Sequence, residues 1–155
     1  MTTAAGFLAD LTPGHRERLL TLARRVTFPA HARIFDEGEK ADRFWILRHG
    51  SVALDIHVPG RPAPIVETLG PGELLGWSWF FPPYRWHLGA RTAAPVTADE
   101  FDAHAVRTRC EEDTGLGYPL ARAIAAVVGQ RLRATRFRLL DLYGPPGAAS
   151  HGGGR

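Results

Sequence analysis

The most informative part of the sequence for the fold is Ile34-Phe35-Asp36-Glu37-Gly38-Glu39-Lys40-Ala41-Asp42-Arg43-Phe44-Trp45-Ile46-Leu47-Arg48-His49-Gly50-Ser51-Val52. It holds the end of one short run, at residues 33–35, and all of another, at residues 44–47, and a glycine comes shortly after each of them. Glycine adopts the positive φ values that tight turns between neighbouring strands require. The stretch therefore predicts two short strands, each followed by a turn.

The same pattern continues on both sides of this stretch. In residues 51–58 apolar and polar residues alternate, which is the period of a strand with one buried face. Further candidate strands lie at residues 26–28, 65–69, 86–92 and 96–101, with Gly- and Pro-containing turns between them. Many short strands separated by such turns indicate an antiparallel barrel or sandwich, which we expect over about residues 26–102.

Helices are expected on both sides of the strands. Thr12 and Pro13 are a typical N-cap and first helical residue, and an apolar stripe from Leu19 to Val26 follows them. Beyond the strands the period changes to that of a helix, first in a short segment at about 103–110 and then in a long one at about 116–143.

The long predicted helix carries an apolar seam with heptad-like spacing. The members of this seam are Ala121, Ala125, Val128, Leu132, Thr135, Leu139 and Leu142. A helix of this length spans ~40 Å, more than a small barrel can cover, so we expect a homodimer in which two such helices pair. The alternative is that the stripe packs only on its own barrel, since small and polar members weaken the seam.

Composition sets the class of protein. The 155 residues, 45% hydrophobic and 23% charged, suit one globular domain, which we place at residues 1–143 with a disordered Gly- and Pro-rich tail at 144–155. Cys110 is the single cysteine, so no internal disulfide can form. The N-terminus lacks a signal-peptide pattern and no stretch is apolar enough to span a membrane, so we expect a cytoplasmic protein with no membrane partner.

The charge is unevenly distributed. Residues 116–155 hold six arginines against one acidic residue, Asp141, which gives this segment a net charge of +5 within a chain of +3. Such a segment can bind nucleic acid or an acidic partner, but the simpler explanation, which we favour, is a solvated helix face.

The order of a helix, about eight strands, a short helix and a long helix resembles that of cyclic-nucleotide-binding domains of the Crp/Fnr type. Residues 34–52 closely resemble the family signature IF-x-EGE-x-AD-x-(aromatic)-(aromatic)-I-x-x-G-x-V. Residues 70–76 resemble the approach to the phosphate-binding cassette, and residues 90–98 resemble the strand after it. The resemblance covers about residues 8–143. It implies a mainly β fold, a double-stranded β-helix (jelly-roll) barrel of about eight antiparallel strands with flanking helices.

The cassette departs from the family pattern at the ribose position. In the family a glutamate accepts a hydrogen bond from the ribose hydroxyl, while an arginine and backbone N–H groups hold the cyclic phosphate. Counting from the preceding turn places the cassette glycine at Gly76 and the ribose position at Trp77. An indole donates one hydrogen bond and accepts none, so Trp77 cannot replace the carboxylate. Arg85 lies near the position of the phosphate arginine.

Two hypotheses follow for this segment, which holds three of the four tryptophans. In the first, an altered aromatic pocket binds a flat or anionic small molecule, with cyclic AMP or cyclic GMP in an altered pose included, and the C-terminal helix passes the signal to a separate output protein. In the second, the aromatics plug the pocket and the chain is a ligand-free dimeric interaction or scaffold protein. The candidate ligand-binding residues are Gly76, Trp77, Ser78, Trp79, Tyr84, Arg85, Trp86 and His87.

Other chemistry has little support in the sequence. None of the seven histidines pairs at the spacing of a cupin-type metal site, and Cys110 has no catalytic partner nearby in sequence, so we expect neither a metal nor an enzyme. No recognition helix is predicted after the long helix, so we expect no sequence-specific DNA binding.

Overall fold

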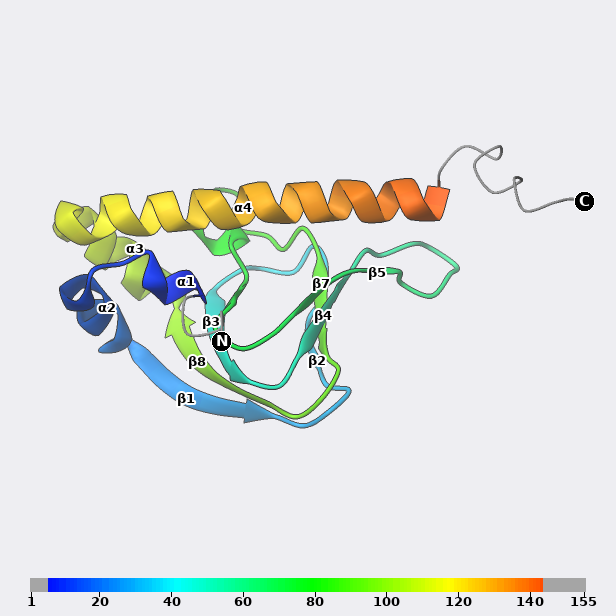
Figure 1. Cartoon of the computed structure of the whole chain (residues 1–155), viewed down its shortest axis with the longest axis horizontal. Coiled ribbons are helices and arrows are strands. Elements are labelled where there is room, and N and C mark those ends of the chain that lie inside the picture. The colour runs from blue at the N-terminus through cyan, green and yellow to red at the C-terminus, as the bar shows by residue number, and fades with distance from the viewer. Residues whose placement is uncertain (1–5, 144–155) are drawn as a thin grey trace, which may run out of the picture.

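Eight strands form two antiparallel sheets with the hydrophobic core between them, in a computed structural model that describes residues 6–143 (Figure 1). The first sheet has the order β1 (Ala23–Phe28), β8 (Val96–Asp102), β3 (Arg43–His49), β6 (Leu74–Leu75). The second has the order β2 (Arg33–Phe35), β7 (Gly89–Thr92), β4 (Val52–Asp55), β5 (Ile65–Leu69). This confirms the expected mainly β, jelly-roll class with about eight antiparallel strands.

The turns of the signature stretch have the conformation that its glycines predicted. Gly38 and Gly50 both have φ of 90°. A Cβ atom on Gly50 would also collide with the carbonyl oxygen of Pro95, so this turn needs glycine for space as well as for φ.

Several strands differ from the sequence prediction. The alternation over residues 51–58 predicted a longer strand, but β4 ends at Asp55. Asp55 is buried and accepts two hydrogen bonds from the Arg33 guanidinium, at 2.6 and 2.9 Å, which pins the end of β4 to β2. The strand β6 has only two residues and shows no period, so it was not predicted. The run predicted at 86–92 forms a strand only from Gly89.

The short helices lie at the ends of the strands. They are α1 (Gly6–Ala9), α2 (Pro13–Leu20), the 3₁₀ helix η2 (Ser78–Phe80) and α3 (Ala103–Glu112). Thr12 caps α2 as expected, since its hydroxyl accepts from the His15 N–H at 3.3 Å. The predicted continuation of this helix to Val26 is wrong, because Val26 lies in β1 and pairs with Ala98 of β8.

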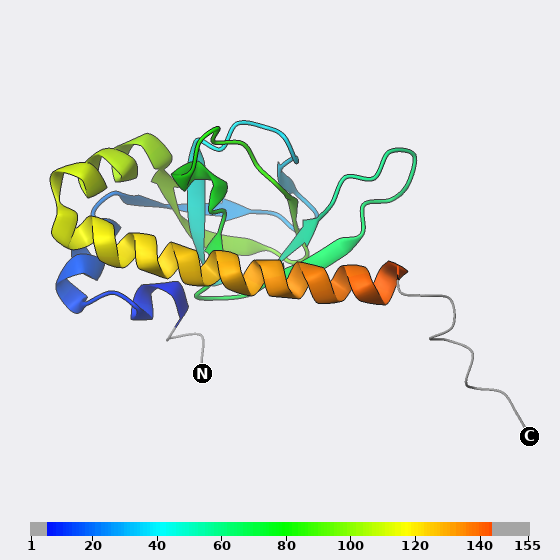
Figure 2. The same ribbon diagram turned by 90° about the horizontal axis from the view of Figure 1, so that it is seen from above.

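The helix α4 (Thr114–Tyr143) runs along the whole molecule and past the sheets (Figures 1 and 2). Its buried face carries Leu116, Leu120, Ala123, Ile124 and Arg131.

The predicted seam lies mostly off this buried face. Ala121, Val128 and Thr135 are half-buried, while Ala125 and Leu132 are exposed. The side chains of Leu139 and Leu142 lie outside the described part of the chain, as does the predicted tail at 144–155. Within residues 6–143, no helix is long and apolar enough to cross a membrane.

Candidate functional site

The cassette segment, residues 76–87, connects β6 to β7 and contains η2. It starts at Gly76, which has φ of 98°. A Cβ atom at this position would lie 2.7 Å from two ring atoms of Trp86, closer than real side chains approach. The backbone at Gly76 and the indole of Trp86 are therefore in direct contact, and only glycine allows it.

Trp86 lies in the aromatic core between the two sheets. Its ring stacks on Phe35 with centroids 4.0 Å apart, and its side chain is 5% exposed. The backbone N–H of Trp86 donates to the carbonyl of Glu39 at 2.9 Å, and the backbone carbonyl of Trp86 accepts from the Gly38 N–H at 2.8 Å. The segment around Trp86 is thus fixed to the turn between β2 and β3.

The other two tryptophans of the cassette have different positions. Trp79 is fully buried, stacks on Phe44 with centroids 4.0 Å apart, and donates from Nε1 to the Gly76 carbonyl at 2.9 Å. Trp77 is half-buried and stacks on the His87 ring at 5.0 Å. Trp77, the residue predicted at the ribose position, supplies no carboxylate and instead forms a stacked aromatic pair with His87.

Arg85 lies at the outer rim of the segment. Its side chain is exposed, and its Nη1 donates to the Gly38 carbonyl at 3.1 Å. The neighbouring Tyr84 has φ of 56°, and the Arg107 guanidinium of α3 lies 4.1 Å above its ring. Arg107 also donates to the Trp79 carbonyl at 2.7 Å, so this one side chain of α3 contacts the cassette segment at both Trp79 and Tyr84.

The space left inside the cassette is very small. A cavity of about 20 Å³ remains, close to the volume that one water needs. Five predicted site residues line it: Gly76, Trp77, Ser78, Trp86 and His87. Three others, Trp79, Tyr84 and Arg85, do not. As binding residues all eight stay predictions.

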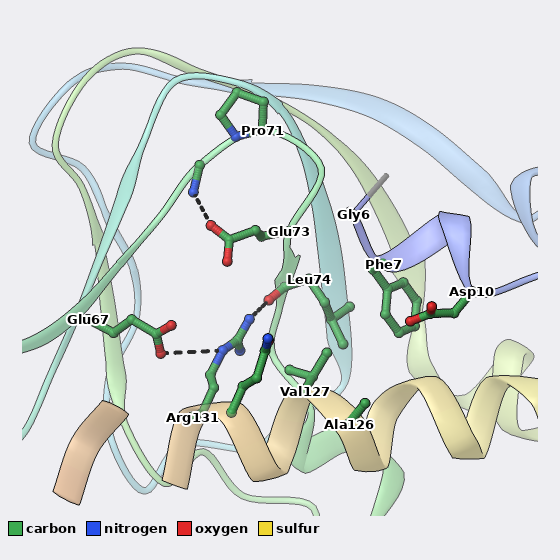
Figure 3. Close-up of a pocket in the computed structure, with 12 residues that line it drawn as sticks. Gly6, Phe7, Asp10, Glu67, Pro71, Glu73, Leu74, Ala126, Val127 and Arg131 are labelled. Carbon is green, nitrogen blue, oxygen red and sulfur yellow. Dashed lines mark hydrogen bonds and ion pairs between the residues drawn. The ribbon is translucent and has the colours of Figure 1, made fainter. Parts of the chain in front are cut away.

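Arg131 of α4 also lines this cavity, and the sequence analysis missed it. Its side chain is 7% exposed and donates from Nη2 to the carbonyl of Leu74 in β6, while Nε lies 3.7 Å from a carboxylate oxygen of Glu67 in β5 (Figure 3). A signal was present, since Leu120, Ile124, Val127 and Arg131 follow the 4,3,4 spacing of one helix face.

Burial shifts the pKa of Arg131 and of Glu67 in the direction that favours the uncharged form of each side chain. The pKa of Arg131 is lowered by burial, against which the carboxylates of Glu67 and Glu73 act. The pKa of Glu67 is raised by burial, which outweighs the nearby Arg131.

A larger groove lies on the other side of Arg131. It has a volume of about 650 Å³ and lies between α1, the turn from β5 to β6, and α4 (Figure 3). The carboxylates of Asp10, Glu67 and Glu73 line it together with Arg131. Three acids and one base give this groove a net negative lining.

The comparisons with known proteins identify the family. Residues 25–113, more than half of the chain, match the family model of the cyclic nucleotide-binding domain. The chain belongs to this family, as its signature stretch indicated.

Relatives agree with this assignment. The chain is 28% identical over 138 residues to the CRP-like cAMP-activated global transcriptional regulator of Mycobacterium tuberculosis, an alignment that covers 89% of the chain. The chain spans 60% of the length of that relative. A solved structure from Geobacter metallireducens GS-15, named for cyclic nucleotide binding, is 29% identical, with a TM-score of 0.71 over 81% of this chain and 91% of that one. A cyclic nucleotide-binding domain from Methylobacillus flagellatus has a TM-score of 0.77 at 14% identity, covering 87% of this chain and 76% of that one.

Proposed function

We propose that this chain is a non-enzymatic regulatory module of the cyclic-nucleotide-binding type whose cassette is held closed by its own Trp86. The observation that carries this proposal is the contact between the Trp86 ring and Gly76, which leaves about 20 Å³ of space. Ligand pockets measure ~300–1,000 Å³, so a cyclic nucleotide has no room while Trp86 stays in place.

The two family contacts to a cyclic nucleotide also lack support here. Trp77, which the family resemblance places at the ribose position, has no carboxylate and stacks on His87. The guanidinium of Arg85 is exposed and bonds to the carbonyl of Gly38 outside the cavity. Between the two hypotheses from the sequence, the geometry therefore favours the plugged pocket.

The module acts through α4, which we propose forms a homodimer and contacts a separate output protein. Exposed apolar side chains support this: Leu132 is 70% exposed and Tyr118 is 71% exposed. Both lie on the face of the predicted seam, where a second helix would cover them. The exposed Arg122, Arg133 and Arg136 give the helix a basic side on which an acidic output protein could dock.

A second candidate function is the sensing of a small molecule in the altered aromatic pocket. It is favoured by the polar groups around the remaining cavity, because a purely structural plug needs none. The Ser78 hydroxyl and His87 Nδ1 lie 2.9 Å apart at this cavity, and Arg131 of α4 also lines it. A flat anionic molecule would enter if Trp86 moved outward.

Thermal unfolding of the full chain tests whether the closed cassette admits a cyclic nucleotide. A ligand at 100 times its Kd adds about 2.7 kcal/mol to the free energy of unfolding, which shifts Tm by several degrees. We expect no shift with cyclic AMP or cyclic GMP, with 5′-AMP as the control. A Tm rise with a cyclic nucleotide and none with 5′-AMP would refute the closed cassette and establish sensing.

A further inference from the structure

Arg131 places a positive charge in the lining of the cassette cavity. Among the described residues that line this cavity it is the one permanently charged side chain, and it comes from α4, far from the cassette in sequence. Arg85, the residue that the family pattern places at the phosphate, is absent from the lining.

We infer that Arg131 of α4, rather than Arg85, is the anion-binding residue of this cassette, and that it receives a phosphate or carboxylate group of a small molecule when Trp86 moves away. This inference rests on the proposed function, in which Trp86 fills the cassette.

The hydrogen bonding of Arg131 leaves capacity for an anion. A guanidinium has five N–H donors on three nitrogen atoms. Nη2 donates to the Leu74 carbonyl, and Nε lies 3.7 Å from Glu67, longer than the 2.7–2.9 Å of a charge-assisted hydrogen bond. Nη1 makes no hydrogen bond to any described residue. A buried cation paired this loosely is stabilised by an additional anion.

The two sides of Arg131 differ in charge. On the groove side, Asp10, Glu67 and Glu73 repel an anion. On the cassette side, no acidic residue lines the cavity, and the hydroxyl of Ser78 and the ring of His87 add hydrogen-bonding groups. An anion that reaches Arg131 is therefore favoured on the cassette side, in the space that the Trp86 ring occupies.

Binding there would act directly on α4. Arg131 is the last buried residue of this helix within its described part, and its present contacts tie α4 to β5 and β6. An anion would replace Glu67 as the partner of Arg131, so that the ligand touches the helix without an intermediate residue.

The test uses the full chain with the plug removed by Trp86→Ala, and by the less disruptive Trp86→Leu as a second opened variant. Isothermal titration calorimetry with cyclic AMP and with inorganic phosphate measures binding. Arg131→Gln and Arg85→Gln are then added separately to the opened variant, with the free energy of unfolding measured without ligand for each.

We expect the opened chain to bind cyclic AMP and Arg131→Gln to weaken its binding at least tenfold, since a hydrogen bond to a charged group is worth about 1.5–3 kcal/mol. Arg85→Gln should change the affinity by less than twofold. A larger loss with Arg85→Gln than with Arg131→Gln, or no binding by either opened variant, would overturn the inference. The titration with inorganic phosphate tests whether an anion without the nucleoside is enough for binding to the opened chain.

Glu67→Gln distinguishes anion binding from a purely structural ion pair. It removes the carboxylate that competes for Arg131, so the opened chain should bind cyclic AMP more tightly. Weaker or unchanged binding in this variant would contradict the inference. Binding by the wild-type chain would instead refute the closed cassette, and the same pair of arginine variants would then be compared in the wild type.

Discussion

At the scale of single residues, the proposed closed state of the cassette rests on the contact between Gly76 and the Trp86 ring. The sequence identified both as site residues because the resemblance placed the cassette glycine at Gly76 and because tryptophans cluster after it. It could not tell which indole turns inward, since Trp77, Trp79 and Trp86 differ only in contacts made after folding. The stacking of Trp86 on Phe35 of β2 joins residues far apart in the sequence.

Gly76→Ala tests the contact at this position. The new Cβ would meet the Trp86 ring at 2.7 Å on a backbone with φ of 98°. We expect the free energy of unfolding to fall by about 1–3 kcal/mol, from the strained φ and the displaced ring together. Urea denaturation measures it.

Gly14→Ala is the matched control. Gly14 lies in α2, and nothing lies within 4 Å of its Cβ position. Alanine should therefore raise stability there by about 0.5–1 kcal/mol, as expected for a helical glycine. If Gly76→Ala were as stable as wild type, Trp86 would not be packed on Gly76 as described.

At the scale of elements, the sequence predicted those with clear periods and missed those without. The strands β2 and β5 have the predicted bounds, and α4 starts within two residues of the predicted start. β6 and α1 are too short to show a period. Arg131 was missed as a site residue because a charged residue on an apolar helix face is usually assigned to solvent, and only its contacts with β5 and β6 explain its burial.

Leu132→Glu tests the proposed pairing of α4. Leu132 is 70% exposed, so the substitution should change the stability of one subunit by no more than about 0.5 kcal/mol. In a paired helix it would place a charge in the seam, so the mass measured by analytical ultracentrifugation should fall from dimer to monomer. Phe137→Glu is the control, because Phe137 is 60% exposed but lies off the seam. Equal masses for wild type and Leu132→Glu would exclude pairing through this seam.

At the scale of the whole molecule, the fold was predictable because its signature is local. Residues 34–52 carry the turns and strands that fix the jelly-roll class, and the family match at residues 25–113 includes them. Whether the cassette is open was not predictable, because that depends on β2, β6, η2 and α4 meeting in space. Whether space remains in the cassette depends on how side chains from all these elements fill it, and no single segment of the sequence determines that.

The attachment of α4 to the sheets should make global stability depend on pH through Glu67. Burial raises the pKa of Glu67 above its usual 4.5, so the folded state binds this proton more tightly than the unfolded state. Its contribution therefore favours folding at low pH and is lost as the pH rises through this raised pKa.

Glutamine cannot ionise, so the Glu67→Gln variant does not lose this contribution to stability as the pH rises. We expect the free energy of unfolding of Glu67→Gln, relative to wild type, to increase as the pH rises from 4 to 7 in urea denaturation. Glu17→Gln, which removes a carboxylate from the exposed surface of α2, is the control. A relative stability of Glu67→Gln that falls over this range would show that Arg131 outweighs the effect of burial.

The aromatic stacking described for the cassette also gives the molecule its own optical reporter. Trp86 and Trp79 are shielded from water, Trp77 is half-buried, and Trp45 lies in the same core as Trp86, with ring centroids 6.3 Å apart. Outward movement of Trp86 would transfer an indole from an apolar environment to water and shift the tryptophan emission to longer wavelength. Intrinsic fluorescence can therefore follow the opening of the cassette in the unlabelled wild-type chain.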